Sequence, residues 1–212
     1  MFGVPRFFDF ASNVAFLAAG VIGLAIVAVR RTAFASTAER WPYVALFAGL
    51  VLTSAGSAYY HLAPDNARLV WDRLPITTTL AGLLLSQVAD RIGVRTANAL
   101  LIPAIVVGAA TVWYWRASDN LVPYGIAQGY AAIATLWIAL AFPSRYTCGS
   151  YIYWAFAWFV IAKVCETYDQ AIYRMLEVVS GHTLKHLAAA AAGFVVCAML
   201  ARRTVRTERA SP

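Results

Sequence analysis

The sequence predicts an all-α integral membrane protein, a bundle of seven transmembrane helices. Of its 212 residues, 61% are hydrophobic and only 13% are charged. An ordinary soluble domain has roughly 45–50% apolar residues, so lipid is the expected solvent for most of this chain. A spanning helix needs about 20 mostly apolar residues, and the chain offers that length repeatedly. The predicted spans are residues 10–29, 43–62, 73–90, 97–113, 123–142, 151–172 and 182–201.

The first three spans are defined by their ends. Residues 10–29 form an apolar run that stops at Arg30 and Arg31. These arginines separate the run from AFAS, a weak signal-peptidase-like stretch, so we expect the span to be retained. The second span ends at His61 and is followed by APDN, a breaker with strong turn chemistry. Asp72 opens the third span, so the chain is expected to leave and re-enter the membrane on one side.

The last four spans are bounded by charged and aromatic residues. The fourth follows Arg95, the fifth precedes Arg145, and the seventh begins with HTLKH. The segments lack the two-residue alternation of a membrane barrel, which favours helices. Aromatic rings prefer headgroup depth. The residues expected there are Trp41, Tyr43, Trp71, Trp113, Trp115, Tyr124, Tyr146 and Tyr151.

The arginines predict the orientation. Ten of them fall in the tail or in the loops on one side, and five fall on the other. The positive-inside rule places the N-terminus outside and the C-terminus in the cytoplasm, most simply in the cell (inner) membrane. The net charge of +7 is therefore read as a topology signal and a contact with anionic lipids, with no nucleic-acid partner.

The chain is predicted to be a single domain, residues 1–212. No internal repeat or linker interrupts it, and only residues 205–212, VRTERASP, have the composition of a frayed tail. Cys148, Cys165 and Cys197 are odd in number and widely spaced. We interpret them as small packing residues rather than as a disulfide or metal set.

Three polar residues stand out around the end of the second span. Ser57 and His61 are four residues apart, so both project from one helix face. Asp72 returns to the depth of His61 after the short connection. An ionisable residue at membrane depth is a functional hypothesis by default. The alternative is a histidine that reaches the interface and an ordinary helix-capping aspartate.

The remaining two histidines open the seventh span. His182 and His186 have the i, i+4 spacing that lets two imidazoles on one helix face bind one metal ion. The second span runs outward and the seventh inward, so all three histidines of the chain share the external layer. Three imidazoles with an open fourth position are the ligand set of a catalytic zinc site. Asp72 could then act as a general base, and Ser57 could assist at an oxyanion or orient a ligand.

Two further polar groups have alternative interpretations. Lys163, Glu166 and Asp169 in the sixth span favour an internal ion pair or a supporting role over direct catalysis, and Lys185 could complete their network. At the head of the first span, FDFASN contains Asp9, Ser12 and Asn13. It is typical of a helix N-terminal cap, and the alternative is that it supports the metal site.

The combined pattern resembles the alkaline ceramidase family. It consists of SxxxH, an aspartate eleven residues later in DRLP, and HxxxH at the start of the last span. The family belongs to a wider group of seven-helix metal hydrolases that includes adiponectin receptors and haemolysin-III-like proteins. The likeness extends from FDFASN to GHTLKH, with WDRLP where DELP is typical. FDFASN keeps only the Ser-Asn part of the calcium-binding segment of the eukaryotic enzymes, so we do not expect calcium dependence.

The resemblance implies a zinc-dependent hydrolase that cleaves the amide of a ceramide-like membrane lipid to a long-chain base and a fatty acid. It makes His61, His182 and His186 the zinc ligands, with Asp72 and Ser57 catalytic. One alternative is a lipid-binding receptor or membrane-stress protein with a structural zinc. Another is an electron-transfer bundle with haem on the same histidines, which the small number of histidines disfavours.

Overall fold

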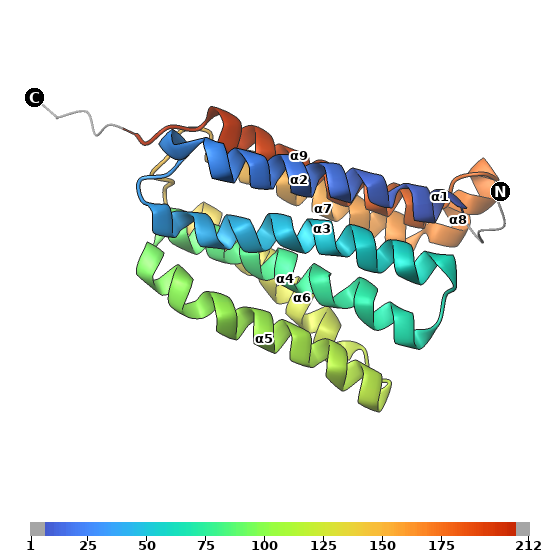
Figure 1. Cartoon of the computed structure of the whole chain (residues 1–212). Coiled ribbons are helices and arrows are strands. Elements are labelled where there is room, and N and C mark those ends of the chain that lie inside the picture. Colours follow the sequence, from blue (N-terminus) through green and yellow to red (C-terminus); the bar gives the residue numbers. More distant parts are fainter. Residues whose placement is uncertain (1–6, 207–212) are drawn as a thin grey trace, which may run out of the picture.

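The computed structural model describes residues 7–206, and helices account for most of them. The long helices run back and forth along a common axis, so that α1 and the end of α9 lie at opposite ends of the bundle (Figure 1). Among the described residues the only β-type pairing is one isolated bridge, between Tyr146 and Val205. The helices are α1 (Phe7–Ala11), α2 (Asn13–Val29), α3 (Arg40–Leu62), α4 (Asn66–Arg91), α5 (Val94–Ser118), α6 (Val122–Ala141), α7 (Tyr151–Thr167), α8 (Asp169–Leu176) and α9 (Gly181–Arg202).

Five helical segments are long and apolar enough to cross a membrane, which supports the predicted membrane class. They are Phe7–Val29, Thr37–Leu62, α5, α6 and α9. The predicted span 73–90 lies in α4, which buries polar residues such as Thr77, Gln87 and Asp90 and is therefore less apolar overall. The predicted span 151–172 is interrupted, because α7 ends at Thr167 and the chain turns at Tyr168 into the separate helix α8.

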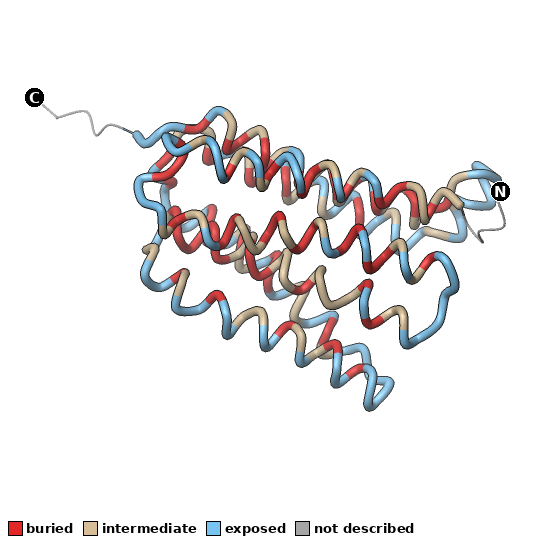
Figure 2. The backbone as a smooth tube through the Cα atoms, viewed as in Figure 1, coloured by how far each residue is buried: buried red, intermediate tan, exposed pale blue. Residues whose placement is uncertain are grey.

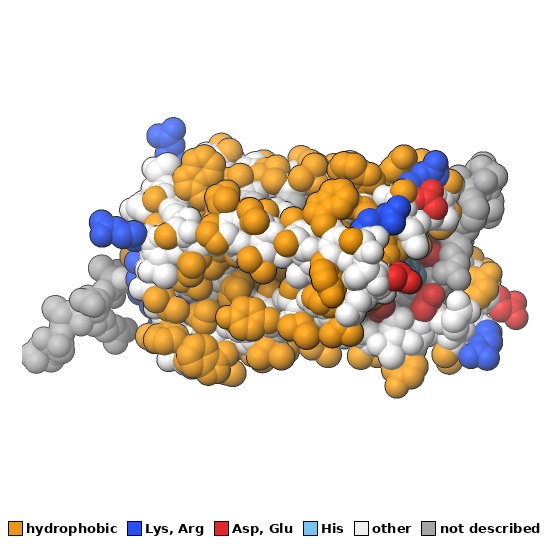
Figure 3. All heavy atoms as spheres, turned by 90° about the horizontal axis from the view of Figure 1, so that it is seen from below, with side chains coloured by type: hydrophobic (Ala, Val, Ile, Leu, Met, Phe, Trp, Pro, Cys, Tyr) orange, Lys and Arg blue, Asp and Glu red, His pale blue; other side chains and the backbone are white. Residues whose placement is uncertain are grey.

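The outer faces of the helices are apolar, as the membrane class requires. Large hydrophobic side chains such as Ile102, Ile133 and Trp154 are exposed on α5, α6 and α7. Buried positions recur on the inward sides of the long helices (Figure 2), and charged side chains gather toward the two ends of a largely hydrophobic surface (Figure 3). A continuous apolar surface of this kind is stable when it faces lipid.

Half of the residues predicted to be interfacial aromatic anchors are buried instead. Tyr43, Trp115, Tyr124 and Tyr146 are each less than a tenth exposed, whereas Trp41, Trp71 and Trp113 are exposed. These four rings do not face lipid, because each lies against an arginine side chain of the protein; their place at headgroup depth stays a prediction. Tyr43 and Tyr146 lie beside the Arg203 guanidinium, and Trp115 and Tyr124 lie beside that of Arg73.

The end of the bundle away from the histidines is closed by polar contacts. Arg203 is buried and donates to the Ala33 carbonyl and the Tyr43 hydroxyl at 2.8 and 2.7 Å. Past α9, the Arg206 N–H donates to the Arg145 carbonyl at 2.9 Å, and Val205 forms the bridge to Tyr146. Residues 207–212 of the predicted tail lie outside the described residues.

Candidate metal centre

The three histidines meet at one point, as the sequence predicts. His61 lies in the last turn of α3, and His182 and His186 lie in the first two turns of α9. Their ligand atoms all lie within 4.8 Å of one another, and their ring centroids are separated by 4.6 to 5.4 Å. His61 and His186 are buried, and His182 is partly buried. The group is close enough to bind one metal ion.

The start of α9 is fixed by contacts that set the direction of both its histidines. The Ser180 side chain caps the helix by accepting from the Thr183 N–H at 2.9 Å. The Asp169 carboxylate accepts from the His182 backbone N–H at 2.8 Å. Gly181 has no room for a side chain, because a Cβ there would come within 2.2 Å of the Cys165 carbonyl oxygen. The helix start is therefore seated on the corner between α7 and α8.

The FDFASN segment, at the junction of α1 and α2, also contacts the start of α9 and supports its histidines. Ser12 Oγ lies 2.9 Å from His186 Nδ1 and donates to the Asp9 carbonyl at 3.0 Å. Because the hydroxyl hydrogen is used in that bond, Nδ1–H of His186 is the donor to Ser12, which leaves Nε2 as the metal-binding nitrogen. The carboxylate of Asp9 accepts hydrogen bonds from Ser180 and Thr183. The helix-cap interpretation is wrong for Ser12, whose side chain makes no capping bond.

Asp72 reaches this region because α3 and α4 pack unusually closely. A Cβ on Gly56 would lie 2.0 Å from the Trp71 carbonyl oxygen, so only glycine permits the contact. The contact places the start of α4 against the turn of α3 that precedes His61. Asp72 is buried and lines the cavity described below. Ser57 is fully buried, its Oγ has no hydrogen-bond partner among the described residues, and it is not among the residues that line this cavity.

A cavity of about 710 Å³ extends from His182 and His186 into the bundle, and His61 is not among the residues that line it. Most of the lining residues are apolar. The charged, imidazole and amide side chains among them are Asp72, Arg73, Gln128, Lys163, Glu166, His182, Lys185 and His186. Along α9 the lining residues run from His182 to Val196, which is about 21 Å at 1.5 Å per residue. The volume and the apolar lining are those of a small-molecule site, and the length fits an extended chain.

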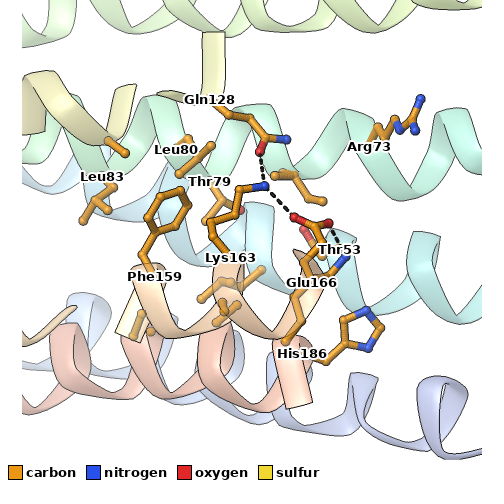
Figure 4. Close-up of a pocket in the computed structure, with 18 of the residues that line it drawn as sticks. Thr53, Arg73, Thr79, Leu80, Leu83, Gln128, Phe159, Lys163, Glu166 and His186 are labelled. Carbon is orange, nitrogen blue, oxygen red and sulfur yellow. Dashed lines mark hydrogen bonds and ion pairs between the residues drawn. The ribbon is translucent and has the colours of Figure 1, made fainter. Parts of the chain in front are cut away.

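The charged residues of α7 form the ion-pair network that the sequence favours. Glu166 accepts from Lys163 at 2.6 Å and from Lys185 at 3.0 Å, and Lys163 also donates to Gln128 at 3.3 Å (Figure 4). The two lysines come from α7 and α9, so the network ties these helices beside the cavity. The carboxylate of Asp169 accepts a hydrogen bond from the backbone N–H of His182.

Sequence reasoning did not identify several residues that position the site. Gly56, Ser180 and Thr183 act through backbone contact or through Asp9. Ser180 and Thr183 have the spacing of a helix start, which was a usable signal. The need for glycine at position 56 depends on a neighbouring helix and has no local signature.

The donor set fits a metal ion. His182 Nε2 is buried and has no hydrogen-bond partner among the described residues, so a metal ion bound there would satisfy it. His186 is already oriented through its other nitrogen, which is the usual arrangement of a metal-binding histidine. No protein-family model matches the sequence, and no curated protein matches it.

Proposed function

We propose that the chain is a zinc-dependent intramembrane hydrolase that cleaves the amide bond of a ceramide-like lipid, giving a long-chain base and a fatty acid. One observation carries the proposal: the ligand atoms of His61, His182 and His186 lie within 4.8 Å of one another, and His182 and His186 line a long, mainly apolar cavity that Asp72 also lines. The resemblance to alkaline ceramidases agrees with that arrangement.

Zinc is the metal that best suits these ligands. Three imidazoles with no thiolate are typical of catalytic zinc, whereas structural zinc sites are closed by four protein ligands. Among the described residues, the metal-binding group contains only the three histidines. When bound, zinc supplies a Lewis acid that lowers the pKa of a coordinated water and polarises a carbonyl.

The side chains of the site have separate tasks in amide hydrolysis. Asp72 accepts a proton from the attacking water as the water oxygen bonds to the amide carbon. Asp72 then delivers that proton to the amide nitrogen as the C–N bond breaks. The products are a carboxylic acid and an amine. Ser57, one turn before His61 on α3, is buried and does not line the cavity, so we assign it the role of orienting a ligand rather than of contacting the oxyanion. Ser12 holds the ring of His186 in the orientation that binding requires.

The cavity also explains how a lipid would be held. An acyl chain lies along the apolar part that ends near Ile152 and Val196, with the amide at the histidines. The surrounding apolar walls exclude bulk water and strengthen electrostatic interactions at the carbonyl. We further propose that α4 and α7 cross the membrane with the five apolar segments, giving seven spans with an external N-terminus and the metal site toward the external face.

The geometry disfavours the haem alternative, and hydrolysis separates the receptor alternative. Haem iron takes its axial ligands from opposite faces of a porphyrin ring, whereas these three imidazoles converge on one point without space for a ring between them. A receptor with a structural zinc would bind lipid and metal but release no fatty acid.

The test is hydrolysis by the purified protein in detergent. Zinc-loaded protein is incubated with a panel of lipid amides and esters, with and without a chelator, and released fatty acid is measured. We expect chelator-sensitive release from amides. Asp72→Asn should keep one zinc per chain and lose at least about 100-fold in turnover, while Asp65→Asn, in the exposed turn before α4, should behave as the wild type. Zinc binding with no hydrolysis of any lipid would favour the receptor.

A further inference from the structure

Arg73 is a cation at the cavity that the proposed chemistry does not use. It follows Asp72 in α4 and lines the same cavity. Its guanidinium lies over the ring of Trp115, 3.9 Å from the centroid, and 5.5 Å from that of Tyr124. Its Nη1 atom is buried and has no hydrogen-bond partner among the described residues. In Figure 4 it lies apart from the Lys163–Glu166 pair.

This arrangement leaves the side chain ready to bind an anion. A guanidinium has a flat face and an edge that carries its N–H donors, and aromatic rings occupy only the face. The edge matches the two oxygens of a carboxylate or phosphate, which it binds with two parallel hydrogen bonds. A buried donor without a partner is costly, so an anion at this edge would also stabilise the folded protein.

The position of Arg73 indicates which part of a lipid would carry the anion. Asp72 and Arg73 are neighbours in α4 and both line the cavity, so we place the arginine at the same end of the cavity as the reacting amide. The apolar part of the cavity, toward Ile152 and Val196, is suited to the acyl chain. The charge therefore belongs to the amine portion of the substrate. The lysines are less suited to this role, because Glu166 already pairs with both Lys163 and Lys185.

We propose that Arg73 binds an anionic headgroup, and that the natural substrate is a long-chain lipid amide with a carboxylate or phosphate on its amine portion. The substrate assignment rests on the proposed function, whereas the binding of an anion by Arg73 does not depend on it. The other source of the same chemistry is the headgroup of an anionic phospholipid of the bilayer.

The first experiment compares three amides that share a palmitoyl chain: N-palmitoylglycine, N-palmitoyl-O-phosphoethanolamine and the neutral N-palmitoylethanolamine. We expect kcat/KM of the zinc-loaded wild type to be about 10- to 100-fold higher for at least one anionic amide, the range of a charge-assisted bidentate contact. Arg73→Gln should lose that preference while its rate on the neutral amide changes by less than about threefold. Arg68→Gln is the matched control and should keep the preference, because Arg68 is a partly exposed arginine beside Tyr59 that does not line the cavity. An unchanged preference in Arg73→Gln, or a wild type that favours the neutral amide, overturns the proposal.

The second experiment measures binding without chemistry. Chelator-treated protein is titrated with the same three amides in nanodiscs of phosphatidylcholine, and then in nanodiscs that contain phosphatidylglycerol. We expect the wild type to bind an anionic amide more tightly than the neutral one, and we expect Arg73→Gln to lose this preference and Arg68→Gln to keep it. This result supports the anion site even if no amide is hydrolysed. In that case only the proposed function fails. If phosphatidylglycerol abolishes the preference, Arg73 holds a bilayer headgroup and the substrate assignment is wrong.

Discussion

Replacement of Gly56 by alanine should separate the catalytic carboxylate from the histidines. The added Cβ would lie 2.0 Å from the Trp71 carbonyl oxygen and 3.3 Å from the Asp72 nitrogen. Ordinary contacts of a Cβ begin at 3.4 Å, so the two backbones must move apart by about 1.4 Å, because no flexible side chain can yield. All three histidines lie on α3 and α9, whereas Asp72 lies on α4. The displacement of α4 from α3 therefore changes the distance between the Asp72 carboxylate and the histidines.

Two losses are expected in Gly56→Ala. Overpacking should lower the free energy of unfolding by about 1–3 kcal/mol, measured as a fall in Tm in detergent. A displacement of about 1 Å at a reacting group can cost roughly 100-fold in rate, so kcat should fall by that factor while bound zinc stays near one per chain. Gly129→Ala is the matched control, since a Cβ there meets nothing within 4 Å. Wild-type turnover in Gly56→Ala would refute the idea that close packing of α3 and α4 positions Asp72.

Three other predictions test separate contacts. Ser12→Ala should weaken zinc binding by about 10- to 100-fold in a chelator competition, because His186 loses the oxygen that fixes its ring; an unchanged affinity would remove Ser12 from this role. Glu166→Gln should lower stability by no more than about 1 kcal/mol, since the pairs with Lys163 and Lys185 are partly exposed, and Glu177→Gln, in an exposed turn, should have no effect. Burial, together with the hydrogen bond to Glu39, raises the pKa of Tyr146 to about 12 from its ordinary value near 10. The folded protein therefore holds this proton more tightly, so stability should fall as the pH rises from 10 to 12, and Tyr146→Phe should reduce that fall in pH-dependent thermal unfolding.

The helical class and the convergence of the histidines could be predicted because both depend on features that can be read directly from the sequence, namely the lengths of apolar runs and the spacing of residues. Long apolar runs mark the membrane class, and the four spans predicted between His61 and His182, an even number, return the chain to the same end of the bundle. The i, i+4 spacing then places His186 beside His182. The structure confirms this convergence, and it confirms the ion pair between Lys163 and Glu166.

The features that the sequence did not reveal have a common physical origin in contacts between distant segments. Tyr43 and Tyr146 have the sequence position of interfacial anchors, yet they enclose Arg203 from the far end of the chain. Ser12 has the local signature of a helix cap, but its partner is His186, 174 residues away. Local propensity could not reveal either partner, because each becomes available only when α9 packs against the earlier helices.

The most direct test of the metal site is X-ray absorption spectroscopy of the purified protein at the zinc edge. We predict one zinc per chain with three imidazole nitrogens at about 2.0–2.1 Å, one further oxygen ligand, and no sulfur. His182→Ala should lose one imidazole contribution and most of the bound metal. A spectrum with sulfur ligands, or a wild-type protein that retains no zinc after dialysis, would contradict the proposed centre.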